Sequence, residues 1–138
     1  MGHDDFQTAF WDAKRAMMTA AEAAYNRHGV RAGQQFILRC LWETDGQTPG
    51  EVAKQLGLST PTVTRAATRM EATGLLRREP HPADARLVRL CLTDRGNELR
   101  DIIANEVRGL TARALDGLDA PARSAFIDAL HSVKKNLS

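Results

Sequence analysis

Apolar positions at both ends of the chain recur every three or four residues, the spacing of one face of an α-helix. This spacing predicts helices over 5–28, about 32–45, 96–116 (beginning near Thr93) and 121–137. In the first of them the apolar positions are Phe6, Phe10, Ala13, Met17, Ala20 and Ala24. In the second, Ile37, Cys40, Leu41 and Thr44 share a stripe. Both ends of the chain are therefore predicted to be helical.

The middle of the chain is predicted to contain shorter elements. Thr48 with Pro49 and Glu51 forms a capping box with proline at the first helical position, and Gly57 ends that helix. Three residues later the same motif recurs, with Thr60 as the cap and Pro61 next to it. It predicts a helix over 60–73 that ends at Gly74.

A β-hairpin is predicted directly after these two helices. The strand-like runs "LLRRE" (75–79) and "LVRLCLT" (87–93) flank the turn sequence "PHPADAR". Helix, tight turn, helix and hairpin in this order are typical of a winged helix-turn-helix.

The predicted helix 60–73 has one apolar and one polar face. Val63, Ala66, Ala67 and Met70 lie within one arc of the helical wheel. Arginine can bond guanine O6 and N7 in a fork, and threonine offers a hydroxyl and a methyl, so the polar face suits DNA. For an isolated helix a solvated surface would be the better interpretation, but the position after a capped helix and a turn favours DNA recognition. The candidate DNA-contacting residues are Thr60, Pro61, Thr62, Thr64, Arg65, Thr68 and Arg69.

Charge and length are consistent with this interpretation. The net charge is only +2, but residues 48–95 hold eight Lys/Arg against five Asp/Glu, while the segments on either side are nearly balanced. This uneven distribution is a weak electrostatic indication of an anionic partner. A chain of 138 residues without a long apolar run or a signal-peptide pattern is expected to be one cytoplasmic domain with no membrane partner.

The middle of the chain resembles MarR-family transcriptional regulators. Asp84-x-Arg86, five residues, Leu92-Thr93, two residues and Gly96 reproduce the family's D-x-R-(x5)-L-T-x-x-G spacing. The preceding "GLLRR" matches the family's G-L-V-x-R, with Arg78 in the place of the arginine. The number and lengths of the surrounding helices extend the resemblance over nearly the whole chain.

The resemblance implies a mainly α fold with a small β-wing, in a single domain over 1–138. Its DNA-binding lobe would span 46–95, and 1–30 with 96–138 would form a helical dimerisation region. It implies a homodimer that binds a pseudo-palindromic operator on double-stranded DNA, as a repressor that responds to a small aromatic or phenolic acid.

Within the wing, the resemblance implies different roles for the arginines. Arg86 would enter the minor groove, and Asp84 would orient it through an ion pair. Arg78 is a further candidate contact at the base of the wing. Arg77, Arg78 and Arg89 could equally be supporting or merely solvated residues.

A ligand cleft between the dimerisation helices and the DNA-binding lobe could include Trp11, His28 and Arg31. Packing is the more common role of an aromatic residue on such a helix, and Arg31 could equally lie on the surface. The start of the second helix has Arg31 and Gly33 where the family often has a Ser/Thr cap.

No catalytic constellation is present, so the chain is not expected to be an enzyme or to need a cofactor. Cys40 and Cys91 are interpreted as structural residues, and His3, His28, His81 and His131 are too scattered to predict a metal site. The alternative to a DNA-binding regulator is a winged helix that binds another protein without specific DNA readout.

Overall fold

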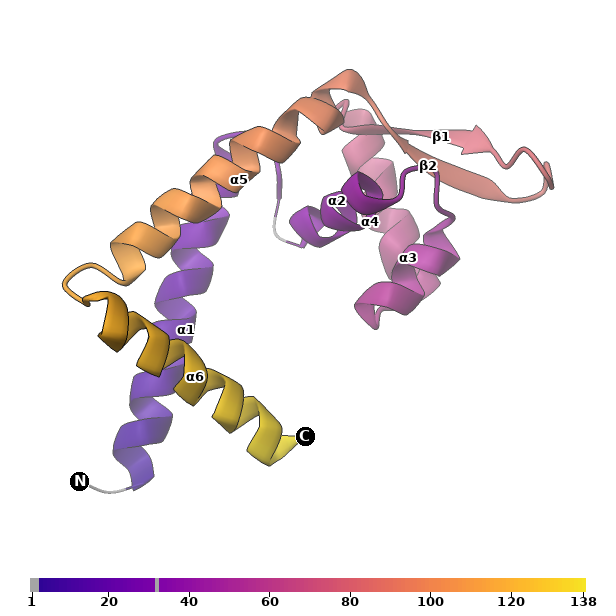
Figure 1. Cartoon of the computed structure of the whole chain (residues 1–138). Coiled ribbons are helices and arrows are strands. Elements are labelled where there is room, and N and C mark those ends of the chain that lie inside the picture. The colour runs from indigo at the N-terminus through magenta and orange to yellow at the C-terminus, as the bar shows by residue number, and fades with distance from the viewer. Residues whose placement is uncertain (1–2, 32) are drawn as a thin grey trace.

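The computed structural model describes residues 3–31 and 33–138, which form six helices and two strands (Figure 1). Helices α1, α5 and α6 extend to one side of a lobe that contains α2, α3, α4 and the hairpin (Figure 1). The predicted mainly helical fold with a small β-wing is therefore confirmed. In chain order the elements are α1 (His3–Asn26), α2 (Gln34–Glu43), α3 (Pro49–Leu56), α4 (Thr60–Ala72), β1 (Leu76–Pro80), β2 (Val88–Leu92), α5 (Asp94–Ala114) and α6 (Ala120–Leu137).

The hydrophobic core lies in the lobe and at the adjoining half of α5. Apolar side chains from every element of the lobe meet there, together with Leu99 and Ile103 of α5. The fully buried members include Ile37, Leu38, Leu41, Val52, Val63, Met70, Leu75, Leu76 and Leu90. None of the described helices is long and apolar enough to cross a membrane.

The second helix is shorter than predicted. It runs from Gln34 to Glu43, because Gly33 at its N-cap is in the left-handed conformation and Thr44 at its C-cap is extended. Three of the four stripe residues, Ile37, Cys40 and Leu41, are buried as predicted, whereas Thr44 lies outside the helix and is exposed.

The apolar stripes of the terminal helices are largely exposed in the single chain. Phe6 and Met17 on α1 and Phe126 and Leu130 on α6 keep between 39% and 53% of their surface. α6 contains no buried residue. The periodicity therefore predicted these helices correctly, but most of their apolar stripe lies outside the core of this chain, in which Ala24 near the end of α1 is buried.

One of the two predicted caps is confirmed and the other is wrong. Thr48 and Glu51 form the predicted capping box at α3. At α4 the cap is Ser59, not Thr60, because the Ser59 backbone is extended and its hydroxyl accepts the Thr62 N–H at 3.2 Å. Thr60 is instead the first residue of the helix.

The hairpin forms as predicted, and a third segment supports it. β1 and β2 pair antiparallel from Leu76 with Leu92 to Pro80 with Val88. On the other edge of β2, the Leu90 N–H donates to the Gln47 carbonyl at 2.7 Å. The Leu92 N–H donates to the Asp45 carboxylate at 2.9 Å. The connection between α2 and α3 therefore holds β2 in place.

The Leu92-Thr93-x-x-Gly96 motif forms the junction between α4, the hairpin and α5. Thr93 caps α5 by accepting the Gly96 N–H, and its hydroxyl donates to the Gly74 carbonyl at 2.6 Å. A Cβ on Gly96 would lie 2.1 Å from the carbonyl oxygen of Leu75, closer than any van der Waals contact allows. The motif is thus explained by close packing of backbone against backbone.

Candidate nucleic-acid interface

The polar face of α4 points away from the core. Val63, Ala67 and Met70 are buried beneath it, and Ala66 is half-buried. Of the seven candidate contact residues Thr62 is half-buried, and the others are exposed: Thr60, Pro61, Thr64, Arg65, Thr68 and Arg69. The helix therefore presents to solvent the same face that the helical wheel indicates.

Arg65 and Arg69 are the uncompensated charges on this face. Within residues 3–31 and 33–138 neither guanidinium forms an ion pair with a carboxylate, and Arg65 makes only a long hydrogen bond of 3.5 Å to the Thr62 hydroxyl. Because an exposed arginine without a carboxylate keeps its full donor set and charge, this face can bond phosphates and base edges.

Each arginine of the wing, in contrast, has a carboxylate partner. On one face of the hairpin, Glu79 accepts hydrogen bonds from Arg77 at 2.6 Å and from Arg89 at 3.1 Å. The bond from Arg77 is the main reason why the pKa of Glu79 is lowered, with a second contribution from the Cys91 thiol. Glu79, which the sequence analysis did not single out, therefore neutralises much of the charge at the base of the wing.

Arg86 is held by Asp84 at the tip of the wing. The Arg86 Nε and Nη2 donate to the two Asp84 oxygens, each at 3.1 Å, and the Arg86 backbone N–H donates to Oδ1 at 3.0 Å. These bonds lower the pKa of Asp84, the side-chain bonds most. The Arg86 side chain is nevertheless 90% exposed. The pair implied by the family resemblance is thus present, with the remaining edge of the guanidinium free to project outward.

Arg78 is not at the tip but lies against α4. Its backbone N–H and its guanidinium both donate to Glu71, in the last turn of that helix. The backbone bond is the main reason why the pKa of Glu71 is lowered. Because the pKa is lowered in the folded state, the pair stabilises the fold at neutral pH, and this contribution is lost as the pH falls through that lowered pKa.

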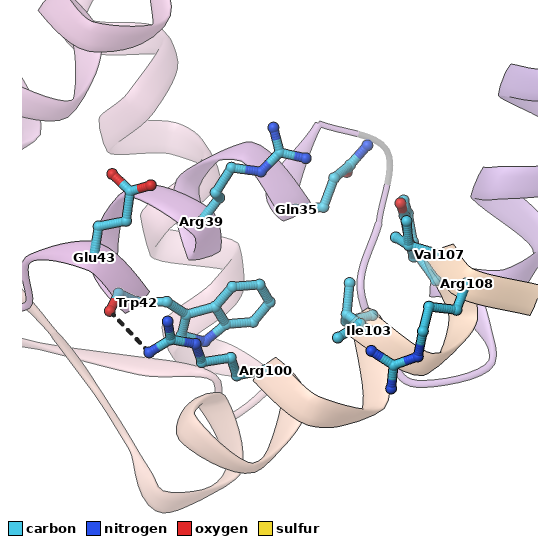
Figure 2. A pocket seen from close by; sticks show the side chains of 10 residues that line it. Gln35, Arg39, Trp42, Glu43, Arg100, Ile103, Val107 and Arg108 are labelled. Atoms are coloured by element: carbon cyan, nitrogen blue, oxygen red, sulfur yellow. Dashed lines mark hydrogen bonds between the residues drawn. The ribbon is translucent and has the colours of Figure 1, made fainter. Parts of the chain in front are cut away.

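A cavity of about 420 Å³ lies between α2 and α5 (Figure 2). Its walls combine apolar and aromatic surface with three arginines, and Arg100 donates to the Trp42 carbonyl at 3.4 Å. The Gln35 Oε1 is buried without a hydrogen-bond partner among the described residues. The lining residues are Tyr25, Gln35, Arg39, Trp42, Glu43, Arg100, Ile103, Ala104, Val107 and Arg108.

None of the predicted ligand residues lines this cavity. Trp11 is half-exposed and borders a separate depression with Lys14, Arg15 and Met18. His28 bonds Glu106 at 2.8 Å, and Arg31 is exposed. Most of α1 separates Trp11 from His28, and a rise of about 1.5 Å per residue keeps the two apart within one chain. The cavity residues carry no motif in the sequence, because three separate helices, α1, α2 and α5, contribute them.

Neither cysteine has the surroundings of a reactive thiol. Cys40 and Cys91 are free and buried, and burial is the main cause that raises the pKa of both. Across the described part of the chain, no three His, Cys, Asp or Glu side chains are grouped so that they could hold a metal ion.

Comparisons with known proteins agree with this geometry. The sequence model of the MarR family matches residues 31–88. The HTH-type transcriptional regulator TtmR of Methylorubrum extorquens is 32% identical over 146 residues, which cover 99% of this chain and 72% of that protein.

Solved structures share the fold over almost the whole chain. The MarR family transcription regulator SP03579 matches with a TM-score of 0.83 at 24% identity. The match covers 97% of this chain and 91% of the chain of that regulator. A MarR family regulator from Listeria monocytogenes, complexed with 26mer DNA, matches with a TM-score of 0.72 at 23% identity. The match covers 95% of this chain and 87% of the chain of that regulator.

Proposed function

This chain belongs to the MarR family of winged helix-turn-helix transcriptional regulators, and from that premise we propose that it is a ligand-responsive repressor. It would act in the cytoplasm as a homodimer on a pseudo-palindromic operator. The observation that carries the DNA-binding part is the exposed face of α4, where Arg65 and Arg69 stand without carboxylate partners among the described residues.

The arrangement suits the two grooves of DNA. An α-helix fits the major groove, where arginine can bond guanine in a fork. The negative potential of a narrow minor groove attracts an arginine such as Arg86 at the wing tip. The DNA complex of the Listeria monocytogenes relative supports the proposal, since that protein has the same fold.

The exposed apolar faces of the terminal helices support a homodimer. Phe6, Met17, Phe126, Ile127 and Leu130 all lie on α1 or α6, outside the core of the chain. A second copy of the chain would cover these side chains, as water would otherwise hydrate a large apolar area. A two-fold dimer would place its recognition helices roughly 34 Å apart on half-sites one helical turn apart. Sedimentation at micromolar concentration should give twice the mass of one chain.

The Arg86→Ala variant tests the wing. We expect it to weaken binding to a duplex selected by the wild type from a random pool by at least about tenfold, since a hydrogen bond to a charged group contributes about 1.5–3 kcal/mol. The slope of log affinity against log salt concentration (the salt slope) should also become shallower, by up to about 0.9 for each wing. Fluorescence anisotropy at several salt concentrations measures both quantities.

Arg15→Ala is the matched control, because Arg15 is an exposed arginine on α1 that also pairs with an aspartate. This variant should leave the affinity for the duplex and the salt slope unchanged. Equal affinity and slope for Arg86→Ala and wild type would refute the wing assignment. A wild-type protein that retains no duplex at physiological salt would instead favour the alternative function, a winged helix that binds proteins.

The cavity between α2 and α5 is the site that we propose for the effector. Trp42, Ile103 and Val107 provide an apolar wall, and Arg39 and Arg108 provide positive charge for a carboxylate (Figure 2). A small aromatic or phenolic acid combines these two features. Because α2 packs in the same lobe as α4 and the hairpin, and α5 connects that lobe to α6, a ligand that binds one arrangement of these helices better would shift the population toward it.

The Arg39→Ala variant tests the cavity. We expect it to weaken binding of 2-hydroxybenzoate by at least about tenfold, because a charge-assisted hydrogen bond is lost. Titration calorimetry measures the affinity. Arg31→Ala is the control, and it should bind like the wild type because Arg31 does not line the cavity. The opposite result, with affinity lost only in Arg31→Ala, would move the effector site to the loop between α1 and α2.

A further inference from the structure

We infer that Glu71 is a positioning residue that locks the wing to the recognition helix, so that Arg86 and the α4 arginines meet DNA in one fixed arrangement. The inference rests on the proposed DNA binding. Arg78, in this account, acts through the position of the wing and not through its own contact with DNA.

Glu71 holds Arg78 through both backbone and side chain. Its Oε2 accepts the Arg78 backbone N–H at 2.8 Å, and its Oε1 accepts the Arg78 Nε at 3.2 Å and Nη2 at 3.0 Å. Three bonds between two residues of different elements fix the direction of the strand as well as its distance from the helix. A single flexible ion pair would not fix the strand in this way, because an exposed pair of long side chains contributes little stability by itself.

The same guanidinium also reaches the candidate DNA-binding face. The Arg78 Nη1 donates to the Thr68 hydroxyl at 3.2 Å, and that hydroxyl donates its own proton to the Thr64 carbonyl at 3.0 Å. Arg78 therefore spans α4 from Glu71 to Thr68, across one turn of the helix. Any rotation of the wing about the end of α4 would break these bonds together.

The hairpin needs such an attachment. Only its base is anchored in the core, through Leu76, Leu90 and Leu92, and a two-stranded hairpin alone is at best marginally stable in water. The segment before α3 holds the β2 edge, at Leu90 and Leu92. Glu71 holds the β1 edge at Arg78, which pairs with Leu90 where the hairpin leaves the core. The two attachments lie on opposite edges at the same level of the hairpin.

Small movements at this level are amplified at the tip. Arg86 lies four residues from Leu90, the strand partner of Arg78, so at about 3.3 Å per residue its backbone is on the order of 13 Å beyond that pair. A rotation of about 10° at the base would therefore displace the Arg86 backbone by roughly 2 Å, enough to break a hydrogen bond. Loss of the Glu71 bonds should thus reduce the contribution of Arg86 to DNA binding even though Arg86 is unchanged.

A double-mutant cycle between Glu71→Ala and Arg86→Ala tests the inference on a duplex selected by the wild type. In the wild-type background, Arg86→Ala should weaken binding at least about tenfold. In the Glu71→Ala background, the same change should weaken it about twofold or less, because interacting residues give non-additive effects. Glu71→Gln, which keeps an acceptor for the Arg78 N–H but loses the charge, should give an intermediate factor. Equal factors in all three backgrounds would overturn the inference.

Two further measurements separate positioning from general damage to the fold. Glu106→Ala removes a carboxylate that bonds Arg27 and His28, far from both DNA-contacting elements, and should leave the tenfold effect of Arg86→Ala intact. Without DNA, amide hydrogen exchange at Arg78 should be faster in Glu71→Ala than in the wild type and unchanged in Glu106→Ala.

Unchanged exchange at Arg78 would show that the attachment does not hold the strand, and would overturn the inference. If the wild type itself bound no duplex, the proposed function and this inference would both fail. If the wild type bound normally but the cycle were additive, only the positioning role would fail.

Discussion

The double variant Arg65→Ala/Arg69→Ala should bind its selected duplex at least about a hundredfold more weakly than the wild type, because each forked contact from arginine to a base contributes about 1–3 kcal/mol. Both residues lie on the exposed face of α4, and no described carboxylate neutralises either of them. A homodimer would lose the contacts in both half-sites. Anisotropy titrations with the selected duplex and with a scrambled one measure specific and non-specific affinity.

The ratio of the two affinities decides between base readout and charge alone. Loss of base contacts should reduce the preference for the selected duplex, whereas loss of phosphate contacts weakens both duplexes alike. Arg15→Ala again provides the control. If a second selection with the double variant returned the wild-type motif with undiminished preference, α4 would not be the element that reads sequence.

Gly96→Ala should lower the free energy of unfolding by about 3 kcal/mol, at the upper end of what overpacking typically costs. The new Cβ would lie 2.1 Å from the Leu75 carbonyl oxygen and 3.1 Å from a Leu92 methyl. Backbone cannot move aside as a side chain can, so α5 would have to shift. The shift would strain the Thr93 cap and the 2.9 Å bond from the Trp42 indole to the Gly96 carbonyl. Thermal unfolding should occur roughly 10 °C lower.

Gly109→Ala on the same helix is the matched control. Nothing lies within 4 Å of a Cβ added there, so alanine should be neutral or stabilising by about 0.5–1 kcal/mol through its better helix propensity. Both variants must be compared at one protein concentration, since the stability of the proposed homodimer would depend on it. A Gly96→Ala protein that melts with the wild type would contradict the close packing at this junction.

Local patterns in the sequence were sufficient to predict most of the elements. The periodicity of Phe6 to Ala24, the capping box of Thr48 and Glu51 and the two strand-like runs each reflect a preference expressed within a few residues. The differences from the structure are equally local: the pattern predicts Thr44 inside a helix that ends at Glu43, and Thr60 as the cap that Ser59 forms. Two adjacent residues that can both cap a helix differ only in backbone conformation, which the sequence pattern does not specify.

The candidate site was predictable only in part. The outward face of α4 follows from spacing, because residues three or four apart on a helix lie on one face. The pair formed by Asp84 and Arg86 was implied by the family resemblance. Glu79, in contrast, neutralises Arg77 and Arg89, and the β-register that brings Arg89 to it pairs residues ten positions apart.

By itself, the sequence determined the order and type of the elements, the buried face of each lobe helix and the resemblance that identifies the family. Only the tertiary structure decided that Arg78 bonds Glu71 and that Gly96 must lack a side chain. It also brought Arg39 and Arg100 to one cavity. The physical reason is range: propensity, capping and periodicity act within about one turn of chain, whereas these contacts join segments whose approach depends on how the whole core packs.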